Sequence, residues 1–406
     1  MKVLVYGESP CIPTGTGLLS KNILRFLIEM GHEIVEMVAI NHFNGDQYDH
    51  DLYPFSIHGN IQDPYNIEQA KQIIRNGNYD LLFLSADVTQ INMLYEAIRE
   101  AKRNKSFTVI CYSCVDCDVI SPQTLAGLTI TDHIVLYSQH SRRITLQHIP
   151  ALNIKVISPG CDPDVFKPLP DGEREEARKK IFNIEDDTFL VVNVNRNQWR
   201  KDPIRTMMIF HEFHQRHPKS LLYMHMKAID VGGNLIMAAN MLGMKMLAPN
   251  LEIMLAGPDF NEQKGVSREF LNKIYAAADV FVSTTTGEGW GLTTTDAMAA
   301  CCPVIVPRNT SALEIIGERE ERGYLVESGG DIDHMIVPYG HDSNTRSIVH
   351  SDDMIRALEE VHEDREIANI KAMEAREWTL RRTWNHAREQ WMKLFAEVEE
   401  RIEVTA

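Results

Sequence analysis

The chain has 406 residues, of which 44% are hydrophobic and 24% are charged, and its formal net charge is −16. This length suits two domains of roughly 150–200 residues each, and the composition is that of an ordinary globular protein. The excess of acidic residues argues against a broad nucleic-acid interface, because such an interface needs a basic face.

The first residues, Met1 to Gly7, form a short apolar run that lacks the architecture of a signal peptide. No apolar stretch approaches the roughly 18–20 residues that a helix needs to cross a bilayer. The chain has seven cysteines, an odd number that fits a reducing compartment better than a disulfide framework. We therefore expect a cytoplasmic protein, and the sequence leaves peripheral attachment to a membrane open.

In the first part of the chain, short β-branched or apolar runs alternate with helical patterns. Leu18, Leu19, Ile23, Phe26 and Leu27 recur at helical spacing, and a glycine follows shortly after them as a C-cap. The strands are expected at residues 3–6, 34–38, 81–84, 108–111 and 134–137. Strands and helices that alternate in this way predict right-handed βαβ units and a parallel sheet.

A second alternating series begins near Phe189. Its strands are expected at residues 189–194, 221–224, 253–255, 280–282, 303–306 and 324–326. The pattern predicts two doubly wound α/β domains, whose ligands should bind in a cleft outside the carboxyl ends of the strands.

The domain boundaries follow from composition, because residues 158–172 between the two series are rich in Pro, Gly and Asp. We place an N-terminal domain at 1–165, a hinge at 166–185 and a C-terminal domain at 186–375. Residues 376–406 are predicted as a C-terminal helix that could pack back on the N-terminal domain.

The most informative stretch follows the strand expected at 280–282. It runs Thr-Gly-Glu-Gly-Trp-Gly-Leu from Thr286 to Leu292 and leads into an Ala/Met-rich helix. Glycines let backbone approach a ligand closely, and a helix N-terminus offers N–H groups that suit an anion. Glu288 and Asp296, eight residues apart, add carboxylates that suit hydroxyl groups rather than phosphate. A ligand that combines phosphates with many hydroxyls is a nucleotide sugar.

Two basic residues begin the second half of the chain. Arg196 and Lys201 stand five residues apart, just after the strand at 189–194, and could converge on one anion at the edge of the sheet. Arginine offers a planar fork for phosphate oxygens, and lysine offers a compact point charge. A solvated basic turn would explain these residues alone, but the glycine loop in the same domain favours an anion site.

With these motifs the chain resembles the family 4 retaining glycosyltransferases, which have the GT-B fold. The resemblance rests on Arg196 and Lys201 together with the Glu-Gly-aromatic-Gly-Leu loop and the acid that follows it. Further matching segments run through nearly the whole chain in order: Pro13-Thr14-Gly15-Thr16-Gly17, Gly31-His32-Glu33-Ile34, Pro159-Gly160-Cys161-Asp162, Phe166-Lys167-Pro168 and Pro303-Val304-Ile305 with Ser311 to Ile316.

This resemblance implies a metal-independent, retaining transfer of a hexose-type sugar from a nucleotide sugar, most commonly a UDP- or GDP-sugar, to an acceptor hydroxyl. It implies that Arg196 and Lys201 hold the diphosphate and that Glu288 binds the transferred sugar. Asp116, which ends the strand region 108–112, is a weaker catalytic candidate. The remaining residues that would line the donor site are Gly15, Thr16, Gly17, Gly289, Trp290, Gly291, Leu292, Thr293 and Asp296.

Two positions depart from the family pattern. The family has Glu where this chain has Asp296, a residue that would contact the ribose hydroxyls. Aspartate is one methylene shorter but keeps the same pair of acceptor oxygens, so the role could survive with a shifted donor. Cys302 stands where glycine is common before Pro303, and we expect only local repacking there.

Other motifs give weaker signals. Asp116 and Asp118 form the D-x-D pattern that in another glycosyltransferase fold holds a divalent cation, but the Arg/Lys pair already supplies charge for a diphosphate. Cys111, Cys114 and Cys117 lack the fourth cysteine of an iron–sulfur site. The loop at 15–20 lacks the third glycine of a dinucleotide fingerprint, and no H-x-x-x-H pair supports zinc. We therefore expect no metal and no cofactor beyond the donor.

Two alternatives keep the fold and change the function. A nucleotide-sugar epimerase or hydrolase would turn over the donor without an acceptor, and a catalytically silent sugar-nucleotide-binding subunit becomes conceivable because of Asp296. The sequence leaves the acceptor open among glycan, lipid, protein, small molecule and modified nucleobase. It also leaves the sugar, the base and the oligomeric state undetermined.

Overall fold

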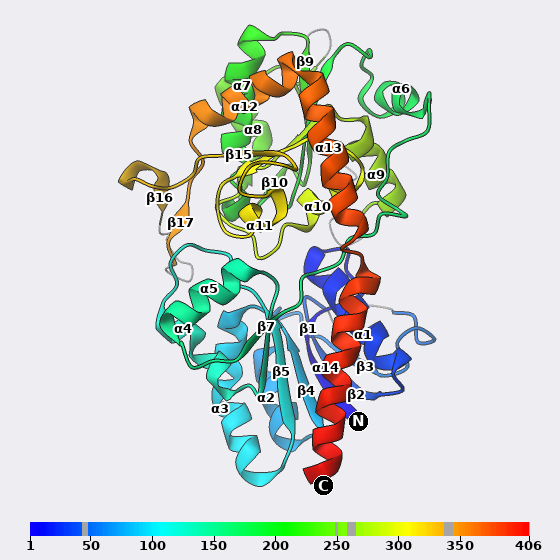
Figure 1. Cartoon of the computed structure of the whole chain (residues 1–406), viewed down its shortest axis with the longest axis vertical. Helices are drawn as coiled ribbons and strands as arrows, with labels where there is room; N and C mark the ends of the chain where they lie inside the picture. Colours follow the sequence, from blue (N-terminus) through cyan, green and yellow to red (C-terminus); the bar gives the residue numbers. More distant parts are fainter. Residues whose placement is uncertain (43–47, 248–250, 258–264, 337–343, 406) are drawn as a thin grey trace.

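The computed structural model describes residues 1–42, 48–247, 251–257, 265–336 and 344–405, and it forms two α/β domains stacked end to end (Figure 1). Each domain has a parallel sheet with helices on both faces. The fold class predicted from the sequence is therefore confirmed.

The N-terminal domain is built on a seven-stranded sheet in the order β3-β2-β1-β4-β5-β6-β7. The strands are β1 (Lys2–Glu8), β2 (Glu33–Ile40), β3 (Ser56–His58), β4 (Leu81–Ser85), β5 (Thr108–Ser113), β6 (His133–Leu136) and β7 (Ile154–Val156). All neighbours pair in parallel. Strand order reverses between β1 and β4, so this sheet has its switch point there, where crevices form in such folds.

Alternation along β1 explains how both faces of this sheet are covered. Val3 and Val5 face a core shared with α1 (Gly15–Glu29), whereas Leu4 and Tyr6 face a core shared with α2 (Ile67–Asn76) and α3 (Val88–Asn104). Successive side chains of a strand point to opposite faces, and apolar burial on both is typical of parallel sheets. The other helices of this domain are α4 (Pro122–Leu125) and α5 (Gln139–His148).

The C-terminal domain repeats the arrangement with a six-stranded sheet in the order β12-β9-β8-β13-β14-β15. Its strands are β8 (Phe189–Val194), β9 (Ser220–His225), β12 (Ile253–Leu255), β13 (Val280–Val282), β14 (Val304–Pro307) and β15 (Tyr324–Val326). The switch point lies between β8 and β13. Both segments that the sequence singled out, after β8 and after β13, therefore leave the sheet at the same place.

Helices surround this second sheet, and two small hairpins extend from it. The helices are α6 (Glu173–Ala177), α7 (Pro203–Arg216), α8 (Leu235–Leu242), α9 (Arg268–Ala277), α10 (Leu292–Ala299), α11 (Ala312–Ile316), α12 (Ser351–Glu363) and α13 (Arg365–Leu380). The hairpin strands are β10 (Ile229–Asp230), β11 (Gly233–Asn234), β16 (Met335–Ile336) and β17 (Arg346–Ser347).

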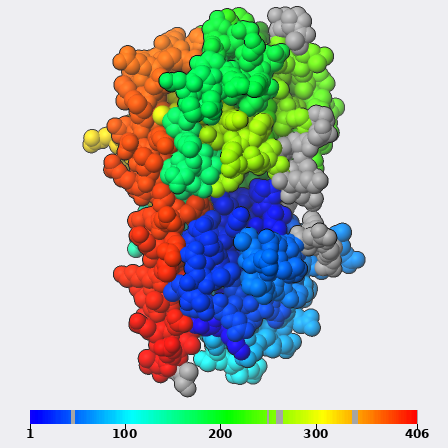
Figure 2. Space-filling model, turned by 90° about the vertical axis from the view of Figure 1, so that its right-hand side faces the viewer, coloured from blue at the N-terminus to red at the C-terminus, as the bar shows by residue number. Residues whose placement is uncertain are grey.

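The last helix, α14 (Trp384–Thr405), leaves the C-terminal domain and lies against the N-terminal one (Figures 1 and 2). Trp391 is fully buried between the rings of Phe83 and Tyr112, with centroids 5.5 and 4.8 Å away. At the surface, Lys155 and Glu397 form an ion pair of 2.7 Å. The chain thus crosses between the domains twice.

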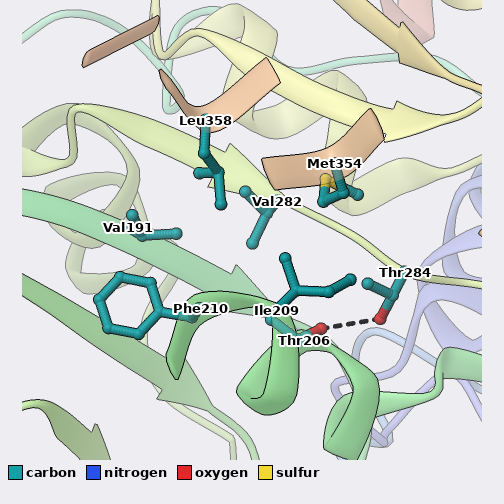
Figure 3. A pocket seen from close by; sticks show the side chains of 8 residues that line it. All are labelled: Val191, Thr206, Ile209, Phe210, Val282, Thr284, Met354 and Leu358. Carbon is teal, nitrogen blue, oxygen red and sulfur yellow. Dashed lines mark hydrogen bonds between the residues drawn. The ribbon is translucent and has the colours of Figure 1, made fainter. Parts of the chain in front are cut away.

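The interior of the C-terminal domain contains a small apolar space between its sheet, α7 and α12 (Figure 3). Its lining includes Val191, Phe210 and Leu358, and its polar edge is closed by a 2.7 Å hydrogen bond between the hydroxyls of Thr206 and Thr284. The residues that line it are apolar side chains and two threonines, so we interpret it as a gap in core packing. In the part of the chain that the structure describes, no helix is both long and apolar enough to cross a membrane.

Candidate active site

The glycine loop is held at the carboxyl end of β13 by hydrogen bonds from both sides. The amide of Thr286 donates to the carbonyl of Arg200 (2.8 Å), and the amide of Glu288 donates to the hydroxyl of Thr310 (2.9 Å). The Ser311 hydroxyl donates to the carbonyl of Trp290 (2.7 Å). Gly291 then caps α10 with φ +99°, a conformation that favours glycine. The position of the Glu288 carboxylate is therefore fixed by its backbone.

A short turn after β8 brings two cations to this carboxylate. Residues Trp199–Lys201 form one turn of 3₁₀ helix, and Asp202 ends it with φ +46°. The Lys201 ammonium pairs with Glu288 Oε1, and Arg200 Nη1 lies 3.3 Å from Glu288 Oε2. The side chains of Glu288 and Lys201 are only 17% and 11% exposed, so this pairing is largely shielded from water.

The N-terminal domain contributes Asp116, from the loop that follows β5. Its Oδ2 lies 3.3 Å from Arg200 Nε, and its Oδ1 lies 2.8 Å from Arg346 Nη2. Arg346 belongs to β17 of the C-terminal domain, is 3% exposed, and stacks 5.4 Å over the ring of Trp199. Five charges thus alternate across the domain gap. We call this set, Arg346, Asp116, Arg200, Glu288 and Lys201, the interdomain charge network.

The pKa shifts in this network favour the ionised forms of its two carboxylates. Burial alone would raise the pKa of Glu288, but Lys201 and Arg200 outweigh it and hold the pKa below its usual range. The pKa of Asp116 is also lowered, because Arg200 and Arg346 outweigh its burial. The three cations exceed the two carboxylates by one, so the network retains positive charge for an anionic ligand.

Arg196 does not join this network. Its Nε donates to Asp230 Oδ2 at 2.9 Å, and its side chain is 52% exposed. The expected convergence of Arg196 and Lys201 on one point is therefore absent from this structure. Arg200 stands beside Glu288 instead, because the turn at 199–201 directs two consecutive basic side chains to the loop. That Arg196 binds a diphosphate stays a prediction.

The glycines of the first domain lie opposite the glycine loop. Thr14 caps α1, accepting a hydrogen bond from the Gly17 amide at 3.0 Å. A Cβ at Gly15 would stand 3.0 Å from Leu292 Cδ1, at the start of α10. The N-termini of α1 and α10 therefore approach each other across the gap, and both present N–H groups of the kind that bind phosphate.

Gly287 lies in very close contact with the N-terminal domain. A Cβ at this position would overlap the carbonyl oxygen of Asp116. We expect Gly287→Ala to separate the loops and lower activity at least about ten-fold, because a misplaced catalytic group is costly. Small-angle scattering should show a more open molecule. Gly257→Ala is the control, since its Cβ would lie more than 4 Å from every described atom beyond its neighbours; equal scattering and activity in both variants would contradict this expectation.

Asp296 lies in α10 beside the glycine loop and carries a perturbed carboxyl group. Burial raises its pKa to about 7 from an ordinary value of 3.8, and the nearby Arg268 offsets this only in part. Arg268 is itself paired with Asp162 at 2.7 Å. A hydroxyl-bearing ligand would supply hydrogen-bond donors to this carboxylate.

This raised pKa predicts a pH dependence of stability. Between about pH 4 and pH 7 the folded protein holds a proton on Asp296 that the unfolded chain has lost, so stability falls as pH rises through this range. The contribution is on the order of 4 kcal/mol. Chemical denaturation of Asp296→Asn should show a shallower decline than the original protein over this range. Parallel curves would show that Asp296 titrates normally.

The two aspartates of the D-x-D pattern have separate partners. Asp118 accepts hydrogen bonds from the amide and the hydroxyl of Ser347, at 2.8 and 2.7 Å, whereas Asp116 faces Arg200 and Arg346. Among the described residues, Cys111, Cys114 and Cys117 form no disulfide. Burial raises the pKa of each of Cys111 and Cys114, which favours the neutral form.

Sequence reasoning missed Arg200 and Arg346. Arg200 had a signal, because it directly precedes Lys201 in a turn. Arg346 had none, because it follows Glu288 by more than fifty residues in a segment without a recognisable pattern. Only the fold shows that β17 returns to the domain gap.

Comparisons with known sequences match parts of the chain. Residues 266–390 match the family described as "Family 4 Glycosyltransferase in conflict systems". D-inositol 3-phosphate glycosyltransferase of Corynebacterium jeikeium is 28% identical over 184 residues, which cover 43% of this chain and 40% of that protein. The chain thus spans about two fifths of the length of this curated relative.

Solved structures match over nearly the full length. Sucrose-phosphate synthase from Thermosynechococcus elongatus has a TM-score of 0.72 at 16% identity, covering 98% of this chain and 99% of its own. HepE from Anabaena, solved in complex with UDP-glucose, has a TM-score of 0.67 at 14% identity, covering 98% and 100%. These likenesses confirm the two-domain fold that the sequence resemblance implied.

Proposed function

We propose that this chain, which is similar to the family 4 glycosyltransferases, transfers a hexose-type sugar from a nucleotide-sugar donor to an acceptor hydroxyl. The transfer proceeds with retention of configuration and requires no metal ion. The observation that carries this proposal is the pairing of Lys201 and Arg200 with Glu288 at the carboxyl ends of β8 and β13.

We propose that the donor diphosphate replaces Glu288 as the partner of Lys201 and Arg200 when it binds. Lys201 and Arg200 neutralise Glu288 in this structure, and a diphosphate carries more charge than one carboxylate. When it arrives between the N-termini of α1 and α10, it draws these cations away. Glu288 is then released to accept hydrogen bonds from hydroxyls of the sugar. The ribose would lie against Asp296, farther along α10.

The chemistry needs charge stabilisation more than a nucleophile. Retaining enzymes with a covalent intermediate use a free carboxylate beside the anomeric carbon. Glu288 and Asp116 are both engaged with cations, which favours substitution on one face of the sugar. The bond from the anomeric carbon to the phosphate oxygen breaks, and a bond to the acceptor oxygen forms. The acceptor proton passes to the departing phosphate, whose charge Lys201 and Arg200 stabilise.

The base of the donor is proposed to be uracil or guanine. HepE in complex with UDP-glucose supports a UDP-sugar, because its structure aligns with 98% of this chain. The acceptor remains open among the classes named above.

The test is a thermal-shift series with UDP, GDP, ADP, CMP and their sugar conjugates. A ligand that binds only the folded state raises its stability with occupancy, by about 2.7 kcal/mol at a concentration 100 times its Kd. We expect one or two diphosphates to raise the Tm. Lys201→Ala should abolish the shift, and Lys219→Ala, a surface lysine paired with Asp187, should not.

The same ligand then separates the alternatives. A transferase consumes the sugar conjugate much faster when an acceptor from a mixed panel is present, whereas an epimerase or hydrolase consumes it equally without one. A binding subunit shows the Tm shift but transfers no sugar to any acceptor, and Asp296→Glu would restore the transfer. The absence of any Tm shift would contradict the proposal.

A further inference from the structure

A second cluster of polar side chains lies outside the active site, at the base of the segment that carries Arg346. Residues 327–336 and 344–350 run antiparallel to each other, and we call these two segments the strap. Backbone hydrogen bonds join them: His350 N to Glu327 O (2.8 Å) and Ile348 N to His334 O (2.7 Å). The strap leaves the C-terminal domain through β16 and β17 (Figure 1).

The tip of the strap touches the N-terminal domain. Thr345 forms an antiparallel bridge with Val119, with N–H to O distances of 3.0 and 3.3 Å. Ser347 donates to Asp118, and Arg346 binds Asp116. Whatever fixes the base of the strap therefore also bears on the gap between the domains.

Three side chains converge at the base. Asp331, His334 and His350 each offer a ligand atom, and these atoms all lie within 4.8 Å of one another. The imidazole rings of His334 and His350 are stacked, with centroids 3.6 Å apart and an interplanar angle of 14°. The backbone of both histidines is anchored by the hydrogen bonds that join the two segments.

Hydrogen bonding prepares these rings for a cation. His350 Nε2 lies 2.9 Å from the carbonyl oxygen of Gly329, so this nitrogen must carry the proton and Nδ1 keeps its lone pair. A metal-bound histidine characteristically donates its second N–H to a carbonyl or carboxylate. His334 Nδ1 lies 2.8 and 2.9 Å from the two carboxylate oxygens of Asp331, and an ion bound by both side chains would take the place of the proton between them.

We propose that Asp331, His334 and His350 bind one divalent transition-metal ion of the zinc class. Two imidazoles and a carboxylate are a common ligand set for such ions, and a water would complete a tetrahedron. Ligand atoms about 2 Å from one ion are at most about 4 Å apart, so the three ligand atoms must draw closer, and one of the stacked rings must turn to direct its lone pair at the ion.

Nearby carboxylates offset the one group that disfavours a cation at this place. That group is the N-terminus of α12, which begins at Ser351 next to His350 and carries partial positive charge. Asp352 and Asp353 in its first turn offset that charge. Asp333 adds a carboxylate beside His334 in sequence. The bound ion would join the two segments of the strap and so stabilise its contacts with the N-terminal domain.

The test uses the full chain, freed of metal with a chelator and titrated with Co²⁺ and Zn²⁺ in the absence of any donor. One equivalent of Co²⁺ should give the visible absorption of a low-coordinate site, and Zn²⁺ should displace it and raise the Tm. Mg²⁺ should do neither, because it prefers six oxygen ligands.

Two variants identify the ligands. His334→Gln and His350→Gln should each weaken Co²⁺ binding at least about ten-fold. Glutamine at 350 can still donate to Gly329, which protects the local fold, and circular dichroism verifies it. His148→Gln, an exposed histidine of α5, is the control and should bind as the original chain does.

Failure of the chain to bind one equivalent of Co²⁺ or Zn²⁺ would overturn this proposal. Binding that persists unchanged in both histidine variants would also overturn it. The readouts involve no sugar nucleotide, so either result leaves the proposed transferase function untouched.

Discussion

Replacing Lys201 by alanine is expected to lower kcat by several orders of magnitude while both domains stay folded. Lys201 is the cation nearest Glu288, and the proposed reaction needs positive charge where the diphosphate departs. Removal of one preorganised donor to a developing charge typically costs about 10²–10³ in kcat. Losing a full charge in a largely buried site should cost at least that.

This variant is structurally mild. Glu288 keeps Arg200 at 3.3 Å, so its carboxylate is not left alone in a buried site. Burial lowers the pKa of Lys201 and Glu288 only partly restores it, so the ammonium is already partly destabilised by its surroundings. Loss of Lys201 should therefore change the Tm little. The loss in kcat would be measured by steady-state kinetics with the sugar conjugate of the nucleoside diphosphate that the thermal-shift series identifies.

Glu288→Ala provides the second half of this test. It removes the group proposed to bind the sugar and frees Lys201 and Arg200 for the diphosphate. We therefore expect kcat to fall by several orders of magnitude while affinity for the free nucleoside diphosphate is kept or rises. Lys219→Ala is the matched control, since its ion pair with Asp187 is exposed. Full activity in both Lys201→Ala and Glu288→Ala would refute the assignment.

Arg346→Gln is expected to open the domain gap and reduce activity by about 30-fold. Arg346 is 3% exposed and binds Asp116 through both its carboxylate and its carbonyl oxygen. Breaking a buried ion pair costs up to 3–5 kcal/mol, but Asp116 is 27% exposed and keeps Arg200. A cost of about 2 kcal/mol to the closed arrangement corresponds to the expected factor.

A positioning role for Arg346 makes a distinctive prediction about the kinetic constants. The residue binds Asp116 of the N-terminal domain, so it should affect closure more than binding of the free diphosphate. Scattering should show a larger radius of gyration, and kcat should fall more than the diphosphate affinity. Arg346→Lys keeps the charge without the planar fork and should recover part of the loss.

Arg216→Gln is the control for this variant, because Arg216 is 46% exposed and pairs with Glu212 and Glu359 within the C-terminal domain. If Arg346→Gln scattered and reacted like Arg216→Gln, the interdomain charge network would have no part in closure.

Much of the fold could be predicted because local patterns determine it. The strands at 189–194, 253–255, 280–282 and 324–326 were predicted with the bounds that the structure gives them. Three of them are fully buried, and all four are mostly apolar runs. Among the strands of the two large sheets, β3 and β7 were missed; they lie at the two edges of the N-terminal sheet, and each includes a polar residue, so neither is a continuous apolar run.

The site was predictable only as far as its motifs are local. The glycine loop and Lys201 were found because each follows a strong strand pattern, and the parallel sheet brings those two positions together. The pairing of Arg196 with Asp230 was not predictable, since it depends on the β10–β11 hairpin. Arg346 was not predictable either, since its contact with Asp116 depends on how the two domains meet.

The return of α14 to the first domain has a consequence for biosynthesis. Trp391, Leu394, Phe395 and Val398 fill the same core as Phe83 and Tyr112. The ribosome synthesises the entire C-terminal domain before this helix, so an apolar surface of the N-terminal domain stays exposed until α14 has been made. The second domain to be translated can be the first to mature, and chaperones would be needed chiefly for the earlier one.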